Sequence, residues 1–169
     1  MDRIISVDSN IFIWGIRGVS SATQANKITT ARNFFKWVDS NNWKILMPAP
    51  MLAEILSPVP PQDHQTILTL IDGRFMVAPF DAAAAHKCGE LLHKSFKQPE
   101  LIQYRADNAI PRQKMKYDCM IASVCISRRV HTLYSDDPHL KIFADGQINV
   151  EPLPNRQPPA VQNPLFGDM

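Results

Sequence analysis

Residues 4–10 of the chain read IISVDSN, a short run of apolar residues that ends in the acid Asp8. Such a run, bounded by polar residues, is typical of a buried β-strand. Ser9 and Asn10, two short polar residues, follow the acid. The segment therefore predicts a buried strand over residues 4–8 that presents a carboxylate at its carboxyl end.

Strands and helices alternate along the rest of the chain. Short apolar runs predict further strands at residues 43–47, 74–80, 131–135 and 148–151. Apolar residues spaced three and four apart, together with Pro and Asp start signals, predict helices at residues 23–40, 51–56, 64–73, 82–96, 117–129 and 138–145. The polar stretch at residues 97–111 is predicted to be irregular. The alternation predicts an α/β fold with a mainly parallel sheet of four to five strands and helices on both faces.

The length of the chain is that of one domain. At 169 residues it can bury a core without disulfide or metal staples. We predict a single domain over residues 1–151. The remaining segment, residues 152–169, is rich in proline and is predicted to be an extended tail without a core of its own.

Composition excludes several classes of protein. The net charge is only +2, so binding to nucleic acid would depend on a local basic surface. The three cysteines form no CxxC pair, which disfavours zinc and disulfide frameworks. Neither a signal peptide nor an apolar run of roughly 18 residues is visible. We expect a soluble, cytoplasmic protein without a membrane partner.

Four carboxylates occupy positions from which they could share one site: Asp8, Glu54, Asp118 and Asp136. Glu54 and Asp118 each lie at the border of the apolar face of a predicted helix, whereas Asp136 follows the strand at residues 131–135. Ligands of parallel α/β sheets gather outside the carboxyl ends of the strands. Acids that are brought together repel one another unless they hold a cation, and a hard divalent metal prefers oxygen ligands. The pattern predicts a metal centre.

Each of these residues also has a simpler interpretation. The alternative for the helical acids is that they are solvated or paired with lysine, and the alternative for Asp8 is that it caps a following helix. Of the neighbours Asp136 and Asp137, one is expected to cap the helix at residues 138–145. The sequence favours Asp136 as the ligand and Asp137 as the cap or as a residue that orients the ligands.

Other polar residues near the acids have candidate roles. Asn10 and Ser135 are expected to orient the acids by hydrogen bonds, although both are also ordinary turn residues. Arg112, Lys114 and Lys116 precede Asp118 and could contact a phosphate backbone. Their alternative interpretation is a solvated loop.

The ordered motifs VDSNIF, PAPMLAEIL, YDCMIASVCI and LYSDD, within residues 4–150, resemble the PIN-domain ribonucleases. The chain looks most like the small single-domain members that include the VapC-type toxins. The resemblance implies a three-layer α/β/α, Rossmann-like fold and an acidic site for Mg²⁺ or Mn²⁺, made by Asp8, Glu54, Asp118 and Asp136. It also implies cleavage of RNA, a cognate antitoxin protein and a homodimer.

Competing functions remain at this stage. Within the family, a toxin competes with an RNA-processing nuclease that is not toxic. A non-catalytic PIN-like binding module is a further alternative. A haloacid-dehalogenase-like phosphatase is disfavoured, because that chemistry needs a second Asp two positions after the first and this chain has Asn10 there.

Overall fold

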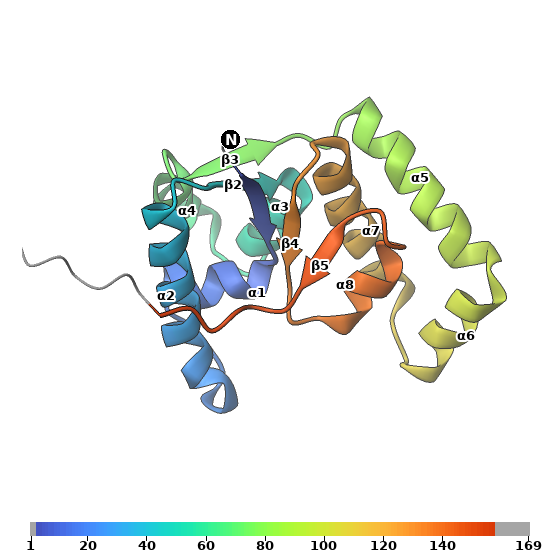
Figure 1. The fold of residues 1–169 in the computed structure, drawn as a ribbon, viewed down its shortest axis with the longest axis horizontal. Helices are drawn as coiled ribbons and strands as arrows, with labels where there is room; N and C mark the ends of the chain where they lie inside the picture. The colour runs from blue at the N-terminus through green and yellow to red at the C-terminus, as the bar shows by residue number, and fades with distance from the viewer. Residues whose placement is uncertain (1–2, 158–169) are drawn as a thin grey trace, which may run out of the picture.

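The computed structural model describes residues 3–157. Its centre is a sheet of five strands in the order β3-β2-β1-β4-β5, with every neighbouring pair parallel (Figure 1). The strands are β1 (Ile4–Val7), β2 (Lys44–Pro48), β3 (Phe75–Ala78), β4 (Thr132–Tyr134) and β5 (Asn149–Glu151). Helices flank the sheet, which confirms the predicted α/β fold class.

The order of the strands creates a switch point between β1 and β4. From β1 the chain adds β2 and β3 toward one edge of the sheet, and it then crosses over to add β4 and β5 on the other side of β1. Ligands of open α/β sheets bind outside the carboxyl ends of the strands at such a point. In the register of this pair, Val7 lies opposite Tyr134, so the residues that follow them emerge next to each other.

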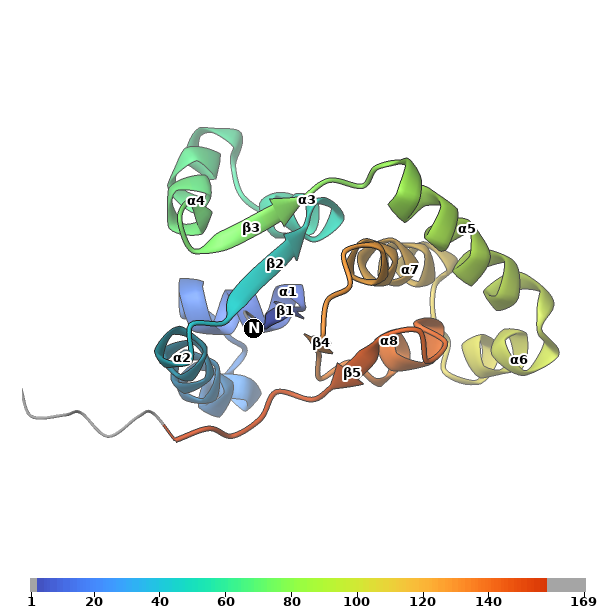
Figure 2. The ribbon, with the colours of Figure 1, turned by 45° about the horizontal axis from the view of Figure 1, so that its top comes forward.

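Helices connect the strands on both sides of the sheet. They are α1 (Ser9–Phe12), α2 (Ala25–Ser40), α3 (Ala49–Leu56), α4 (His64–Ile71), α5 (Ala82–Lys97), α6 (Pro99–Asp107), α7 (Arg112–Ser127) and α8 (Pro138–Phe143). A π-helical turn (Ile13–Arg17) continues α1. Figure 2 shows α2 on one side of the sheet and α3 and α7 on the other, with α5 against α7. No helix within residues 3–157 combines the length and apolar character needed to cross a membrane.

The core explains why these segments fold as they do. Ile5, Val7 and Leu133 on the central strands are fully buried, as a strand covered by helices on both faces requires. The cysteines of α7, Cys119 and Cys125, are free and fully buried among apolar side chains. Burial raises the pKa of each thiol to about 12, so both behave as small hydrophobes.

The structure corrects two predictions in the segment before Asp118. The prediction that residues 97–111 are irregular is wrong, because α6 forms there with Pro99 in its first turn. The helix that carries Asp118 begins at Arg112 rather than at residue 117, immediately after Pro111. Met115, in this added turn, is fully buried, and its packing explains why the helix extends that far.

Residues 152–157 are extended and lie against the domain. Leu153 is buried, and the guanidinium carbon of Arg156 lies 4.6 Å from the ring centroid of Trp37 on α2. This part of the predicted tail therefore contacts the body of the domain. Residues 158–169 lie outside the described residues.

The π-helical turn packs closely on α2, and this contact yields a stability prediction. A Cβ atom at Gly15 would lie 2.3 Å from Cε2 of the buried Phe35 ring. Because the ring is enclosed by the core, we expect Gly15→Ala to lower the free energy of unfolding by ~1–3 kcal/mol. Urea unfolding of the full chain measures the change.

Gly89→Ala is the matched control. Gly89 lies on α5, and a Cβ atom there would have no neighbour within 4 Å. Helix propensity alone should then raise stability by about 0.5–1 kcal/mol. Equal effects of the two substitutions would contradict the close packing at Gly15.

Candidate active site

Asp8 lies at the carboxyl end of β1, at the switch point of the sheet. Its backbone N–H donates to the carbonyl oxygen of Tyr134 over 2.9 Å, which continues the β1–β4 pairing by one residue. Its Oδ1 accepts the Ile11 N–H at 2.9 Å, and its Oδ2 accepts the hydroxyl of Ser135. Asp8 therefore caps α1 and is also held, 8% exposed, at the edge of the sheet.

Ser135 connects the ends of the two central strands. Its hydroxyl donates to Asp8 and also accepts the N–H of Asp137 at 3.0 Å. The Oδ1 atom of Asp137 accepts the N–H of His139 at 2.9 Å, which caps α8. Its other oxygen, Oδ2, accepts from Lys114 Nζ at 2.6 Å. One carboxylate oxygen of Asp137 therefore caps α8, and the other faces Lys114 on α7.

Asp118 reaches the same place from α7. It is 7% exposed, and Lys114 Nζ, one helical turn earlier, lies 3.4 Å from its Oδ1 and 3.3 Å from its Oδ2. Lys114 thus bridges Asp118 and Asp137. Glu54 lies on α3, which contacts α7, and is exposed; its charge acts on Asp118. Asp118 therefore has two other acids, Asp137 and Glu54, near it.

Burial dominates the electrostatics of the two innermost acids. It raises the pKa of Asp8 to about 6, against the hydrogen bonds from Ser135 and Ile11 that lower it. Burial also raises the pKa of Asp118 to about 6; Lys114 opposes this rise, while neighbouring acids add to it. Both carboxylates are poorly compensated when ionised, and this is the environment in which an added cation is stabilised.

Asp136, the acid that the sequence favoured, has different contacts from Asp137. Its Oδ2 accepts from Lys27 Nζ on α2 at 2.6 Å, and its Oδ1 accepts the N–H of Leu153 at 2.8 Å. Its charge still raises the pKa of Asp8. The acid that shares a lysine with Asp118 is nevertheless Asp137. Lys27 was absent from the sequence analysis, because nothing local indicates a partner 109 residues away.

The other basic and polar residues that the sequence proposed differ in their position relative to the acids. Lys114 faces the acids, whereas Lys116 is exposed and lies about 200° around the helix from it. The guanidinium carbon of Arg112 lies 4.4 Å from the ring centroid of Phe96 on α5. Asn10 is exposed on α1, and within residues 3–157 its side chain makes no hydrogen bond to an acid.

The donor chemistry of the site suits a hard cation. Carboxylate and hydroxyl oxygens are the ligands that Mg²⁺ and Mn²⁺ prefer. In the described part of the chain, no three His, Cys, Asp or Glu side chains are arranged so that they could hold a metal ion as they stand. A lysine ammonium lies between two of the carboxylates. The residues present suit a hard divalent ion by donor type and by charge.

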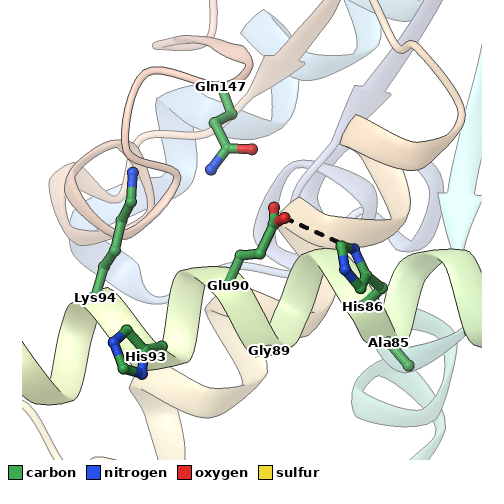
Figure 3. Close-up of a pocket in the computed structure, with 7 residues that line it drawn as sticks. All are labelled: Ala85, His86, Gly89, Glu90, His93, Lys94 and Gln147. Carbon is green, nitrogen blue, oxygen red and sulfur yellow. Dashed lines mark ion pairs between the residues drawn. The ribbon is translucent and has the colours of Figure 1, made fainter.

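Two pockets differ in their relation to the acids. A pocket of about 220 Å³ is lined by Ser135, Asp136 and Asp137 together with Lys141 and Pro152. A larger open pocket, about 730 Å³, lies on α5. In Figure 3, Glu90 forms an ion pair with His86, and Gln147 approaches from the loop before β5. None of the acids at the sheet edge lines this larger pocket, so it is separate from the candidate site.

Comparison with known proteins shows the fold. No family model and no curated protein matches the sequence. A chain in the crystal structure of VapBC2 from Rickettsia felis bound to a DNA fragment from its promoter is similar, with 17% identity and a TM-score of 0.61, over 89% of this chain and 99% of that one. A chain in DNA-bound VapBC from Salmonella typhimurium has 19% identity and a TM-score of 0.60, over 91% of this chain and 100% of that one.

These comparisons define the fold class of the molecule. The VapC component of VapBC complexes is a PIN-domain toxin, and the similarity extends over most of this chain. The PIN-like fold predicted from the motifs is thus confirmed. The comparison is one of fold.

The raised pKa of Asp118 gives a prediction of stability against pH. In the folded protein the pKa is about 6, above the ordinary value of 3.8 for an aspartate, so this group favours folding at low pH and opposes it as the pH rises through that window. In the presence of EDTA, we expect Asp118→Asn to be more stable than the wild type at pH 7.5, by ~2 kcal/mol, and to lose this advantage near pH 4. Urea unfolding at both pH values measures the difference.

Asp39→Asn is the control for net charge, because Asp39 is an exposed acid at the end of α2. It should show no such gain. If Asp118→Asn were instead less stable at both pH values, the ion pair with Lys114 would outweigh the burial of the carboxylate.

Proposed function

We propose that this protein is a metal-dependent endoribonuclease that hydrolyses phosphodiester bonds of RNA with Mg²⁺ or Mn²⁺. The observation that carries the proposal is that Asp137, in the turn after β4, acts by its charge on two buried acids, Asp8 at the end of β1 and Asp118 on α7. Both have a pKa raised to about 6 by burial. Buried carboxylates with a raised pKa are enriched at sites where a cation or a reaction needs them.

The contacts support a revised set of metal ligands. We assign Asp8, Asp118 and Asp137 to the centre, with Glu54 at its exposed side. Asp136 pairs with Lys27 of α2 and accepts the Leu153 N–H, whereas Asp137 shares Lys114 with Asp118. We therefore assign Asp136 to holding those elements in place. The proposed centre therefore still has four acids, as the resemblance implied, but Asp137 replaces Asp136.

The residues of the chain prepare this centre for phosphodiester hydrolysis. In such a site, Mg²⁺ or Mn²⁺ would supply a hydroxide nucleophile near neutral pH and would neutralise charge on the phosphate. Ser135 and the Ile11 N–H each hold one oxygen of Asp8, so the carboxylate is fixed before the substrate arrives. Lys114 supplies a positive charge beside Asp118. Of the three basic residues of α7 that the sequence offers to an RNA backbone, Lys114 is the one that pairs with the acids.

We further propose that the protein is the toxin of a toxin–antitoxin pair. The support is the fold that it shares with chains of two VapBC complexes. A cognate antitoxin protein is then its expected partner, and a homodimer is its expected assembly. An RNA-processing nuclease that is not toxic and a non-catalytic binding module are the alternatives.

The nuclease proposal predicts metal-dependent cleavage. We expect the purified full chain to cleave a labelled single-stranded RNA in Mn²⁺ or Mg²⁺ and not in EDTA, with a matched DNA cleaved poorly. Asp118→Asn should lower the rate by about 100-fold or more, since several kcal/mol of charge stabilisation depends on the ion. Gel analysis of the products measures both rates, with Asp39→Asn as the control.

The same assay separates the two adjacent acids. Asp137→Asn should lower the rate by about 100-fold, like a change at a metal ligand, whereas Asp136→Asn should lower it by less than about 10-fold. The reverse order would restore Asp136 as the ligand. Equal cleavage by the wild type and Asp118→Asn would indicate a contaminating nuclease. Metal binding without cleavage would favour the binding module.

The toxin proposal predicts a growth phenotype. Expression of the wild-type chain in a bacterial host should arrest growth, because RNA cleavage stops protein synthesis, and Asp118→Asn should not. Co-expression of the protein encoded by the adjacent gene should restore growth. Unimpaired growth, combined with RNA cleavage by the purified protein, would favour an RNA-processing nuclease.

A further inference from the structure

Two arginine side chains lie against the ring of Phe96, near the end of α5. The guanidinium carbon of Arg112, at the start of α7, is 4.4 Å from the ring centroid, and that of Arg105, on α6, is 5.9 Å from it. One ring therefore brings together cations from two different helices. Two positive charges on the same ring repel each other, so an anion beside them would stabilise the arrangement.

No carboxylate among residues 3–157 neutralises this pair. Neither guanidinium forms an ion pair or a hydrogen bond with another described residue. Asp107, an acid on the same helix as Arg105, accepts from Gln103 Nε2 at 2.6 Å instead. The contrast is with Arg128, which pairs with the carboxylate of Asp81 at 2.6 Å. The cations around the Phe96 ring therefore lack a counter-ion in the part of the chain that the structure describes.

One nitrogen of Arg105 is also shielded from solvent. Its Nη1 atom is buried and has no hydrogen-bond partner, and it is the only such atom on a charged side chain within residues 3–157. The five N–H donors of a guanidinium point outward in its plane, and the carbon atoms of a ring offer them no lone pair. A buried charged donor without an acceptor is costly, and the loss of water strengthens its attraction to an anion. Arg105 is only partly buried, so its other donors can meet such a ligand.

The two helices that carry the arginines both contact the candidate active site. The Tyr104 hydroxyl, on α6, lies 2.9 Å from Nδ1 of His139, and the His139 N–H donates to Asp137. On α7, Arg112 precedes Asp118 by six residues, which is about 9 Å along the helix axis. A nucleic-acid strand carries one phosphate per nucleotide and covers this distance in roughly three nucleotides. A strand that reaches the acids can therefore place phosphates at the arginines.

We propose that Arg105 and Arg112, arranged around Phe96, bind phosphate groups of a single-stranded RNA beside the acidic centre. This inference rests on the proposed function for the choice of RNA as the ligand, but it requires no metal ion. The planar guanidinium fork matches the oxygens of a phosphate and can donate two parallel hydrogen bonds to it. Lys114, in contrast, is already paired with acids of the site.

The test measures binding of a fluorescein-labelled single-stranded RNA to the full-length protein by fluorescence anisotropy, over a series of KCl concentrations. EDTA is present, so that cleavage is prevented. For a single strand, the logarithm of the binding constant falls with the logarithm of the salt concentration, with a slope of about −0.7 per phosphate contact. We expect Arg105→Met and Arg112→Met each to make the slope less negative by about 0.7, and to weaken binding roughly 5- to 10-fold at about 50 mM salt.

Three further measurements separate a phosphate contact from a packing role. Arg74→Met is the matched control, because Arg74 is exposed beside β3, the strand at the edge of the sheet, and its loss removes the same charge there. It should bind RNA with the wild-type slope. Arg105→Lys keeps the charge but loses the fork, so it should keep the slope and bind more weakly. Urea unfolding of Arg105→Met should show no loss of stability, because the nitrogen that it removes has no partner. Arg112 is exposed, so Arg112→Met tests the site even if Arg105→Met fails to fold.

The outcomes separate this inference from the proposed function. Wild-type slopes in both methionine variants would overturn the arginine site and leave metal-dependent cleavage intact. Lower stability of Arg105→Met together with wild-type RNA binding would assign the side chain to packing. Tighter binding of a labelled polyglutamate peptide than of RNA, lost in both variants, would overturn RNA as the ligand and assign the pair to an acidic protein segment. No binding of RNA to the wild type would overturn the inference, and the cleavage assay in Mn²⁺ decides the proposed function separately.

Discussion

Parallel pairing of β1 with β4 is the constraint on which the candidate site depends. The pairing extends past the end of β1, because the Asp8 N–H donates to the carbonyl oxygen of Tyr134. This bond places the Asp8 carboxylate beside the Ser135 hydroxyl, although 127 residues separate them. The turn after β4 then directs Asp137 toward α7. Loss of this register would disperse the acids, even if every helix were retained.

Burial of the acids in the site has an electrostatic cost. Burial raises the pKa of both Asp8 and Asp118 to about 6, so each favours its protonated form relative to a carboxylate in water. Lysines from two helices on opposite sides of the sheet, Lys27 and Lys114, offset part of the charge. Within residues 3–157 no lysine or arginine forms an ion pair with Asp8, so the hydrogen bonds from Ser135 and the Ile11 N–H are what offset the burial of its carboxylate.

The sequence predicts the helices and strands whose buried residues are regularly spaced. It does not predict a helix without buried residues, or the role of a residue that depends on a long-range contact. The strands and most helices have clear apolar spacing, so their order and type follow from it. No residue of α6 is buried, and its polar composition therefore resembled a loop. The pattern indicates Asp8 as a candidate from its place at the end of an apolar strand, and Glu54 and Asp118 from their place at the border of an apolar helix face. The choice between Asp136 and Asp137 depends on the course of a turn and on Lys27, which no local pattern encodes.

The two adjacent acids after β4 show how one short turn serves both the fold and the chemistry. Asp136 binds Lys27 from α2 and the backbone of Leu153, and so joins the extended residues 152–157 to the far side of the sheet. Asp137 caps α8 and meets Lys114. Because consecutive side chains leave the turn in different directions, one charge joins the turn to α2 while the next lies beside Lys114 of α7. If the chain held both acids toward the same side, the added repulsion would raise the pKa of Asp8 and Asp118 further and weaken the fold that positions them.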